Sequence, residues 1–244
     1  ASTDHGPTFA TVILDRRRFL VVLGGAAALQ TLGPSLAFAR RVAAALPTLQ
    51  PWTLPDALPA SPIEAARALI GAAILAPSHW NAQPWRFEVD GGELRIVLDG
   101  TRTSPLDDPD QRFAQMSLGA SLENLLVAAR AWGQQPEVRY LPWGASPRPG
   151  ASLVAATVSW TPGERAHDRA LFAAIPERRS NPYGFDGRAI PAASRNQLLA
   201  QVGEEVRVHW LEDRTDLRAV GELVHDAVEL VQSDRRAQAE RLRW

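Results

Sequence analysis

Two stretches in the middle of the chain carry apolar residues at the spacing of an α-helix. The pattern predicts a helix over 63–75, with Ser61 as N-cap and Pro62 in the first turn. A longer helix is predicted over 112–132, and Gly133 follows it as a stop signal. The apolar stripe of the longer helix consists of Leu118, Leu122, Leu125, Leu126 and Ala129. We expect this stripe to face the core.

Four apolar runs of strand length lie on either side of the longer helix. Runs over 85–89 and 94–98 flank an Asp-Gly-Gly sequence, which favours a hairpin turn. Runs over 138–143 and 153–160 predict a second pair of neighbouring strands.

The last third of the chain predicts mainly helices. A short helix is predicted from His167 to about Arg178, followed by helices over 191–202 and 214–244. A strand is predicted between these last two helices, over 206–211.

The junction between the first helix and the first strand carries a group of polar residues. The stretch 76–87 reads Ala-Pro-Ser-His-Trp-Asn-Ala-Gln-Pro-Trp-Arg-Phe, and its two prolines require the helix to stop near Ala76. Ser78, Asn81 and Gln83 therefore lie on a stiff loop, which can present amide groups to a planar polar ligand. A turn in which Ser and Asn bond their own backbone explains the same residues.

A second candidate binding stretch lies at the end of the short helix. Arg178 and Arg179 precede Ser180, and two guanidinium groups beside a hydroxyl can bind a phosphate. A solvated helix end, where cations complement the helix dipole, fits the spacing equally well.

The loop over 99–111 is polar, and three of its acidic residues, Asp107, Asp108 and Asp110, lie close together in the sequence. A calcium loop would also need a glycine and a closing glutamate, which this stretch lacks at the required positions. We therefore expect a solvated acidic loop.

Composition excludes several classes of function. The formal net charge of −1 gives no reason to expect nucleic acid or an anionic membrane as a partner. The absence of cysteine excludes disulfides, thiolate metal sites and cysteine nucleophiles. The histidines show no metal-binding spacing, so we expect no metal site. With 45% hydrophobic residues, the 244-residue chain can bury a sizeable core.

Residues 1–39 are predicted to contain a targeting segment. Arg16, Arg17 and Arg18 precede a short apolar run, and Ala37-Phe38-Ala39 fits a cleavage site. The Arg-Arg-x-Phe-Leu sequence resembles the twin-arginine signal, which exports folded proteins, and implies an extracytoplasmic or periplasmic location. A membrane anchor is the alternative, but the run is shorter than the roughly 20 residues that span a bilayer. A proline-rich linker is expected over 40–60.

The loop stretch resembles the Ala-Pro-Ser-x-x-Asn-x-Gln-Pro-Trp motif of the nitroreductase family, whose members bind FMN. Every fixed position is filled, by Ala76, Pro77, Ser78, Asn81, Gln83, Pro84 and Trp85. The helix over 112–132 is similar to the central helix of that family. The arginine stretch resembles the second family signature, Arg-x-Ser/Thr-x-Arg followed by an aromatic residue. Arg178, Ser180 and Phe185 match it, but Pro182 stands where the second arginine is expected.

The order of the two signatures is reversed relative to ordinary nitroreductases. This order resembles a subgroup of exported proteins in which two nitroreductase-like halves are fused into a pseudo-dimer. The resemblance implies an α+β fold, a mixed sheet with helices on its faces, and places the halves at 61–165 and 166–244. Because family members are longer, we expect the second half to be incomplete. A monomer acting as a pseudo-dimer or a homodimer is implied.

The resemblance also implies the cofactor and the function. The residues expected to contact FMN are Pro77, Ser78, His79, Asn81, Gln83, Arg178, Arg179 and Ser180. A donor such as NAD(P)H would reduce the flavin, which would pass a hydride to a nitroaromatic or quinone. No protein acid or base is needed, in keeping with the lack of an evident His/carboxylate or Ser/His/Asp constellation in the sequence.

Two other functions remain open. A non-catalytic protein that binds or sequesters flavin is favoured by export away from cytosolic nicotinamide and by Pro182. A structural domain that has lost its ligand is the third possibility.

Overall fold

In the computed structural model, the chain forms two compact units. The first ends at Arg178, and the second spans Arg179–Arg243. Each unit is described by itself. The residues that the structure describes are 53–90, 92–141, 151–163, 168–181, 183–203 and 205–242. The predicted targeting segment lies outside these residues, as does most of the predicted linker.

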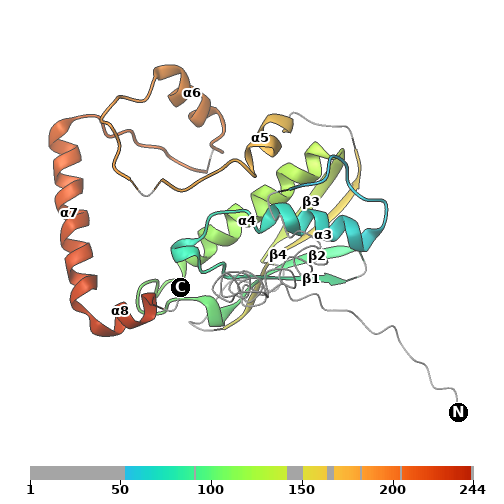
Figure 1. Ribbon diagram of the computed structural model, residues 1–244, viewed down its shortest axis with the longest axis horizontal. Coiled ribbons are helices and arrows are strands. Elements are labelled where there is room, and N and C mark those ends of the chain that lie inside the picture. The colour runs from blue at the N-terminus through green and yellow to red at the C-terminus, as the bar shows by residue number, and fades with distance from the viewer. Residues whose placement is uncertain are drawn as a thin grey trace, which may run out of the picture. The chain divides into compact units, whose positions relative to one another are not determined.

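The first unit contains a four-stranded sheet in the order β1-β2-β4-β3 (Figure 1). Its strands are β1 (Trp85–Asp90), β2 (Glu93–Leu98), β3 (Gln134–Tyr140) and β4 (Leu153–Pro162). The hairpin joining β1 and β2 is confirmed. All three strand pairings described are antiparallel, so the parallel pairing that a mixed sheet requires does not occur among them.

Three α-helices belong to the described part of this unit. They are α3 (Pro62–Ala73), α4 (Arg112–Ala131) and α5 (Arg169–Ala174), and the first two confirm the predicted helices. Figure 1 shows α3 and α4 running alongside each other next to the sheet. The predicted α+β class is therefore confirmed.

The core lies between the two long helices and one face of the sheet. Its fully buried side chains include Leu69 of α3, Leu125 of α4, and Leu94, Ile96 and Leu98 of β2. Each contributes about 1.5–3 kcal/mol relative to exposure. Successive side chains of a strand point to opposite faces of the sheet. In β2, Leu94, Ile96 and Leu98 therefore point toward the helices, and Arg95 points away from them.

The contact between α3 and α4 depends on small residues. Ala72 and Ala73 of α3 are fully buried, and Ser121 of α4 is buried as well. Asn124 of α4 donates a hydrogen bond from Nδ2 to the carbonyl of Ala72 at 3.2 Å. This bond occupies a carbonyl near the end of α3, next to the loop that carries the polar motif.

The second unit contains α6 (Ala192–Ala200), α7 (Arg214–Ser233) and α8 (Arg235–Arg241). The predicted strand over 206–211 is wrong, because this described segment is neither helix nor strand. An alternating sequence forms a strand only where a partner strand supplies hydrogen bonds.

The single helix predicted over 214–244 is also wrong, since it is interrupted at Asp234. The backbone of Asp234 is extended (φ −85°, ψ 106°), and its side chain caps α8 by accepting the N–H of Arg236. In the described part of the chain, no helix combines the length and apolar character needed to cross a membrane.

Candidate functional site

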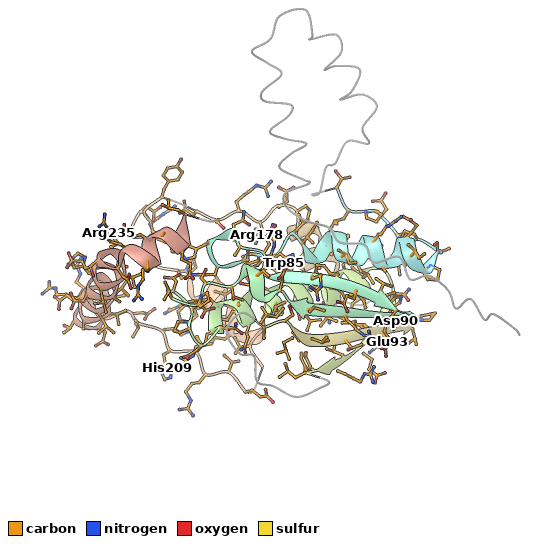
Figure 2. All side chains as sticks on the ribbon, turned by 90° about the horizontal axis from the view of Figure 1, so that it is seen from below. Trp85, Asp90, Glu93, Arg178, His209 and Arg235 are labelled. Atoms are coloured by element: carbon orange, nitrogen blue, oxygen red, sulfur yellow. The ribbon has the colours of Figure 1, made fainter. Side chains whose placement is uncertain are left out.

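The polar motif forms a loop between the end of α3 and the start of β1. The helix ends in a tightened turn, where Leu75 and Ala76 donate their N–H groups to carbonyls three residues earlier. The 3-10 turn η3 (His79–Asn81) follows, and β1 begins at Trp85. In Figure 2, Trp85 and Asp90 mark the two ends of β1, and the loop adjoins the Trp85 end.

Three residues of this loop have left-handed backbone conformations although none is glycine. Their φ angles are +50° at Trp80, +54° at Asn81 and +51° at Gln83. Asn tolerates this region, but each of the other two costs about 1 kcal/mol or more. Such conformations persist where surrounding contacts enforce them, and they cluster at functional sites.

Hydrogen bonds within the loop, and from a neighbouring turn to the loop, help to hold this backbone conformation. Ser78 Oγ accepts the backbone N–H of Gln83 at 3.0 Å. Arg102, from the turn η4 (Gly100–Arg102), donates from Nη1 to the carbonyls of Ala82 and Gln83 at 3.1 and 3.2 Å. The guanidinium group therefore places a positive charge directly against this part of the loop.

Side-chain contacts fix the other end of the loop. Asp107 Oδ2 lies 2.7 Å from His79 Nε2 and accepts the indole N–H of Trp80 at 2.6 Å. The imidazole of His79 stacks on Phe113 of α4, with ring centroids 4.5 Å apart and planes at 11°. The backbone N–H of His79 is donated to Ser117 Oγ at 3.2 Å. Together these contacts attach the loop to the first turns of α4.

The prediction of a solvated acidic loop is wrong for two of the three clustered aspartates, Asp107 and Asp108. The side chain of Asp107 is 7% exposed because it is bound to the motif loop. Asp108 is 5% exposed and caps α4 by accepting the backbone N–H groups of Phe113 and Ala114. Only Asp110 of the three lies exposed. Among the described residues, no group of three or more His, Asp or Glu side chains could hold a metal ion.

The structure also forms a His/carboxylate pair that the sequence did not reveal. His79 and Asp107 are 28 residues apart, and no local spacing marks them as partners. Arg102, Phe113 and Ser117 were missed for the same reason. Their sequence signals are weak. Arg102 is an isolated arginine in the preceding loop, and Phe113 and Ser117 are an aromatic residue and a serine in the first turns of α4.

The second predicted stretch is divided between the two units. Arg178, the last residue of the first unit, donates from Nη2 to the carbonyl of Leu75 at 3.3 Å. The structure thus brings Arg178, labelled in Figure 2, to the residue that immediately precedes the motif. Arg179 and Ser180 belong to the second unit, so their placement at the site stays a prediction.

Comparison with known proteins relates the chain to one named activity. No family model matches it. A protein of Mycobacterium tuberculosis (strain ATCC 25618 / H37Rv) named "Putative NAD(P)H nitroreductase" is 31% identical over 138 residues. This region is 57% of the present chain and 39% of the relative, so the chain spans less than half of that protein. The similarity supports a relationship to the nitroreductase family.

Two further relatives from Mycobacterium tuberculosis carry no activity in their names. One uncharacterized protein, from strain H37Rv, is 32% identical over 117 residues, which are 46% of this chain and 33% of the relative. Another, from strain CDC 1551, is 28% identical over 166 residues, which are 68% of this chain and 22% of the relative.

The side chains of the motif that remain available for a ligand are two amides. Asn81 is exposed and Gln83 is half-buried. Asn81 and Gln83 form hydrogen bonds through their backbones. Within the part of the chain that the structure describes, neither amide side chain has a hydrogen-bond partner. Each amide offers both a donor and an acceptor, so the loop presents groups that can bind a flat polar ligand.

Proposed function

We propose that the chain is an FMN-binding oxidoreductase of the nitroreductase type, which reduces nitroaromatic or quinone acceptors with NAD(P)H as donor. The observation that carries this proposal is the motif loop. Its left-handed backbone is held by contacts from two other segments, while the amides of Asn81 and Gln83 are left unengaged. Preorganised polar groups of this kind are typical of ligand sites.

The residues of the loop fit the polar edge of an isoalloxazine ring. That edge alternates carbonyl oxygens with an N–H group, and the amides of Asn81 and Gln83 can pair with both kinds of group. Ser78 holds the loop through its oxygen lone pair and retains its own hydroxyl proton for donation. We propose that Pro77 and His79 mainly maintain the conformation of the loop. Direct contact of either residue with the flavin stays a prediction.

Positive charge at the loop suits both the phosphate and the ring of FMN. Arg178 bonds Leu75 at the start of the motif, and its exposed guanidinium can pair with a phosphate. We assign Arg179 and Ser180 to the same phosphate group. Arg102 lies against Ala82 and Gln83, where its charge would favour an anionic reduced ring. The flavin supplies the hydride chemistry, and the protein supplies position and charge.

A protein that sequesters flavin without catalysis is the second candidate. The feature favouring it is Pro182, which replaces the second arginine of the signature and removes one cationic group from the site. Both functions require Asn81, so flavin binding alone does not separate them. They differ in whether a second planar molecule can approach within about 3–3.5 Å of the flavin.

The test uses the purified full chain in two stages. Binding is measured first, by flavin fluorescence during titration with FMN, for the wild type and for Asn81→Ala. Weaker binding by the variant supports the site, whereas equal binding by both proteins refutes it. NADPH is then added to the complex, followed by menadione. Bleaching within seconds and return of the colour support the enzyme, and bleaching by dithionite alone supports sequestration.

A further inference from the structure

Asp107 ties together two consecutive side chains of the motif loop through one carboxylate oxygen. Its Oδ2 lies 2.7 Å from His79 Nε2 and 2.6 Å from Trp80 Nε1. Charge-assisted hydrogen bonds of this length are stronger than those between neutral groups. The side chain of Asp107 is 7% exposed, so water competes little for this acceptor oxygen.

The same loop segment that carries Asp107 also begins α4. Asp108, the next residue, caps the helix, and Phe113 in its first turn stacks on the imidazole of His79. His79 is therefore held from two sides, by a carboxylate and by an aromatic ring. Trp80 meets His79 edge to face, with centroids 5.2 Å apart, so the two rings also constrain each other.

These contacts bear directly on the backbone of the next residue. Trp80 has φ +50°, a conformation that bulky aromatic residues rarely adopt, and Asn81 follows it at +54°. The indole bond to Asp107 is one of the contacts that favour this conformation. If the bond were lost, Trp80 could relax to a negative φ, and the amide of Asn81 would turn with it.

We propose that Asp107 is a positioning residue of the flavin site, which acts on the ligand through Trp80 and Asn81 without touching it. This inference rests on the proposed function, because it concerns the ring end of the same ligand. The carboxylate contacts His79 and Trp80, whereas Arg178, assigned to the phosphate, contacts Leu75. Loss of Asp107 therefore affects recognition of the ring and leaves recognition of the phosphate unchanged.

The experiment compares FMN with riboflavin, which has the same ring and no phosphate. Asp107→Ala should weaken binding of both ligands by the same factor, about tenfold to a hundredfold, as expected for loss of charge-assisted bonds. Asp107→Asn retains an oxygen acceptor without the charge, and it should weaken both by a smaller factor. Asp110→Ala, in the same loop but exposed, is the matched control and should bind both ligands as the wild type does.

Nitrogen NMR of the His79 imidazole gives a readout that does not depend on flavin. In the wild type, the neutral ring should carry its proton on Nε2, the nitrogen facing Asp107, and Asp107→Ala should release this tautomer preference. Circular dichroism establishes that each variant is folded. If Asp107→Ala does not fold, Asp107→Asn decides the result.

Several outcomes would overturn the inference. Binding of both ligands at wild-type strength by the folded alanine variant would show that Asp107 does not position the ring. If FMN binding fell while riboflavin binding did not, Asp107 would act at the phosphate. An unchanged His79 tautomer would contradict the assigned contact. Failure of the wild type to bind any flavin would instead refute the proposed function, and this is measured first.

Discussion

Replacing Asp108 with alanine should destabilise the first unit by removing the cap of α4. Asp108 is 5% exposed, and its carboxylate accepts the N–H of Phe113 at 3.2 Å and the N–H of Ala114 at 2.9 Å. The substitution leaves both donors without this partner in the first turn of a 20-residue helix. Loss of a cap and of bonds to a charged acceptor together cost about 2–4 kcal/mol.

The assay is thermal and urea unfolding followed by tryptophan fluorescence, since the buried Trp85 and Trp132 both belong to the first unit. For a chain of this size, a loss of 2–4 kcal/mol corresponds to a fall in Tm of about 5–15 °C. Asp108→Asn keeps one acceptor oxygen and should lose about half as much.

Asp110→Ala is the control from the same loop. Its side chain is 67% exposed, and its ion pair with Arg112 at 3.3 Å is exposed on both sides. The expected change is therefore within about 0.5 kcal/mol. If Asp108→Ala changed stability no more than this control, the carboxylate would not be an effective cap and the argument from burial and geometry would be refuted.

Three further predictions concern the phosphate, the second unit and the leader. Arg178→Ala should weaken FMN binding about tenfold to a hundredfold and riboflavin binding much less, and equal losses would exclude a phosphate contact. Asp213 accepts the N–H of Thr215, which lowers the pKa of its carboxyl from 3.8, so this cap of α7 is intact above that value and lost as pH falls through the folded-state pKa. The hydrogen-exchange protection of Thr215 should therefore fall in acid, but not in Asp213→Asn. With Arg16 and Arg17 both replaced by lysine, the precursor should stay uncut in the cytoplasm, and unchanged secretion would refute the twin-arginine prediction.

The local parts of the fold were predictable because their signals lie within a few residues. The helical stripe of α4 and the stop at Gly133, which adopts φ +74°, fix that helix from the sequence alone. The Asp-Gly-Gly turn likewise fixes the hairpin of β1 and β2. The break at Asp234 had a local signal as well, since an aspartate can cap a new helix, but the apolar periodicity of α7 masked it.

The candidate site was only partly predictable, because its support comes from distant segments. The motif itself identified Ser78 and Asn81, and the structure places both on the expected loop. The role of Asp107 could not be deduced, because a polar loop residue looks solvated until its partners are known. The left-handed backbone at Trp80 was equally hidden, since no side-chain preference favours it.

The distances along the chain between the loop and its partners have a consequence for folding. Ser117 and His79 are 38 residues apart, Asp107 and His79 are 28 apart, and Arg102 and Ala82 are 20 apart. Each contact closes a long segment of the chain, which costs more entropy than a local contact does. An isolated peptide of the motif should therefore be unstructured, and the loop should be among the last parts of the first unit to form. Binding of the proposed flavin would then mark a molecule whose first unit has finished folding.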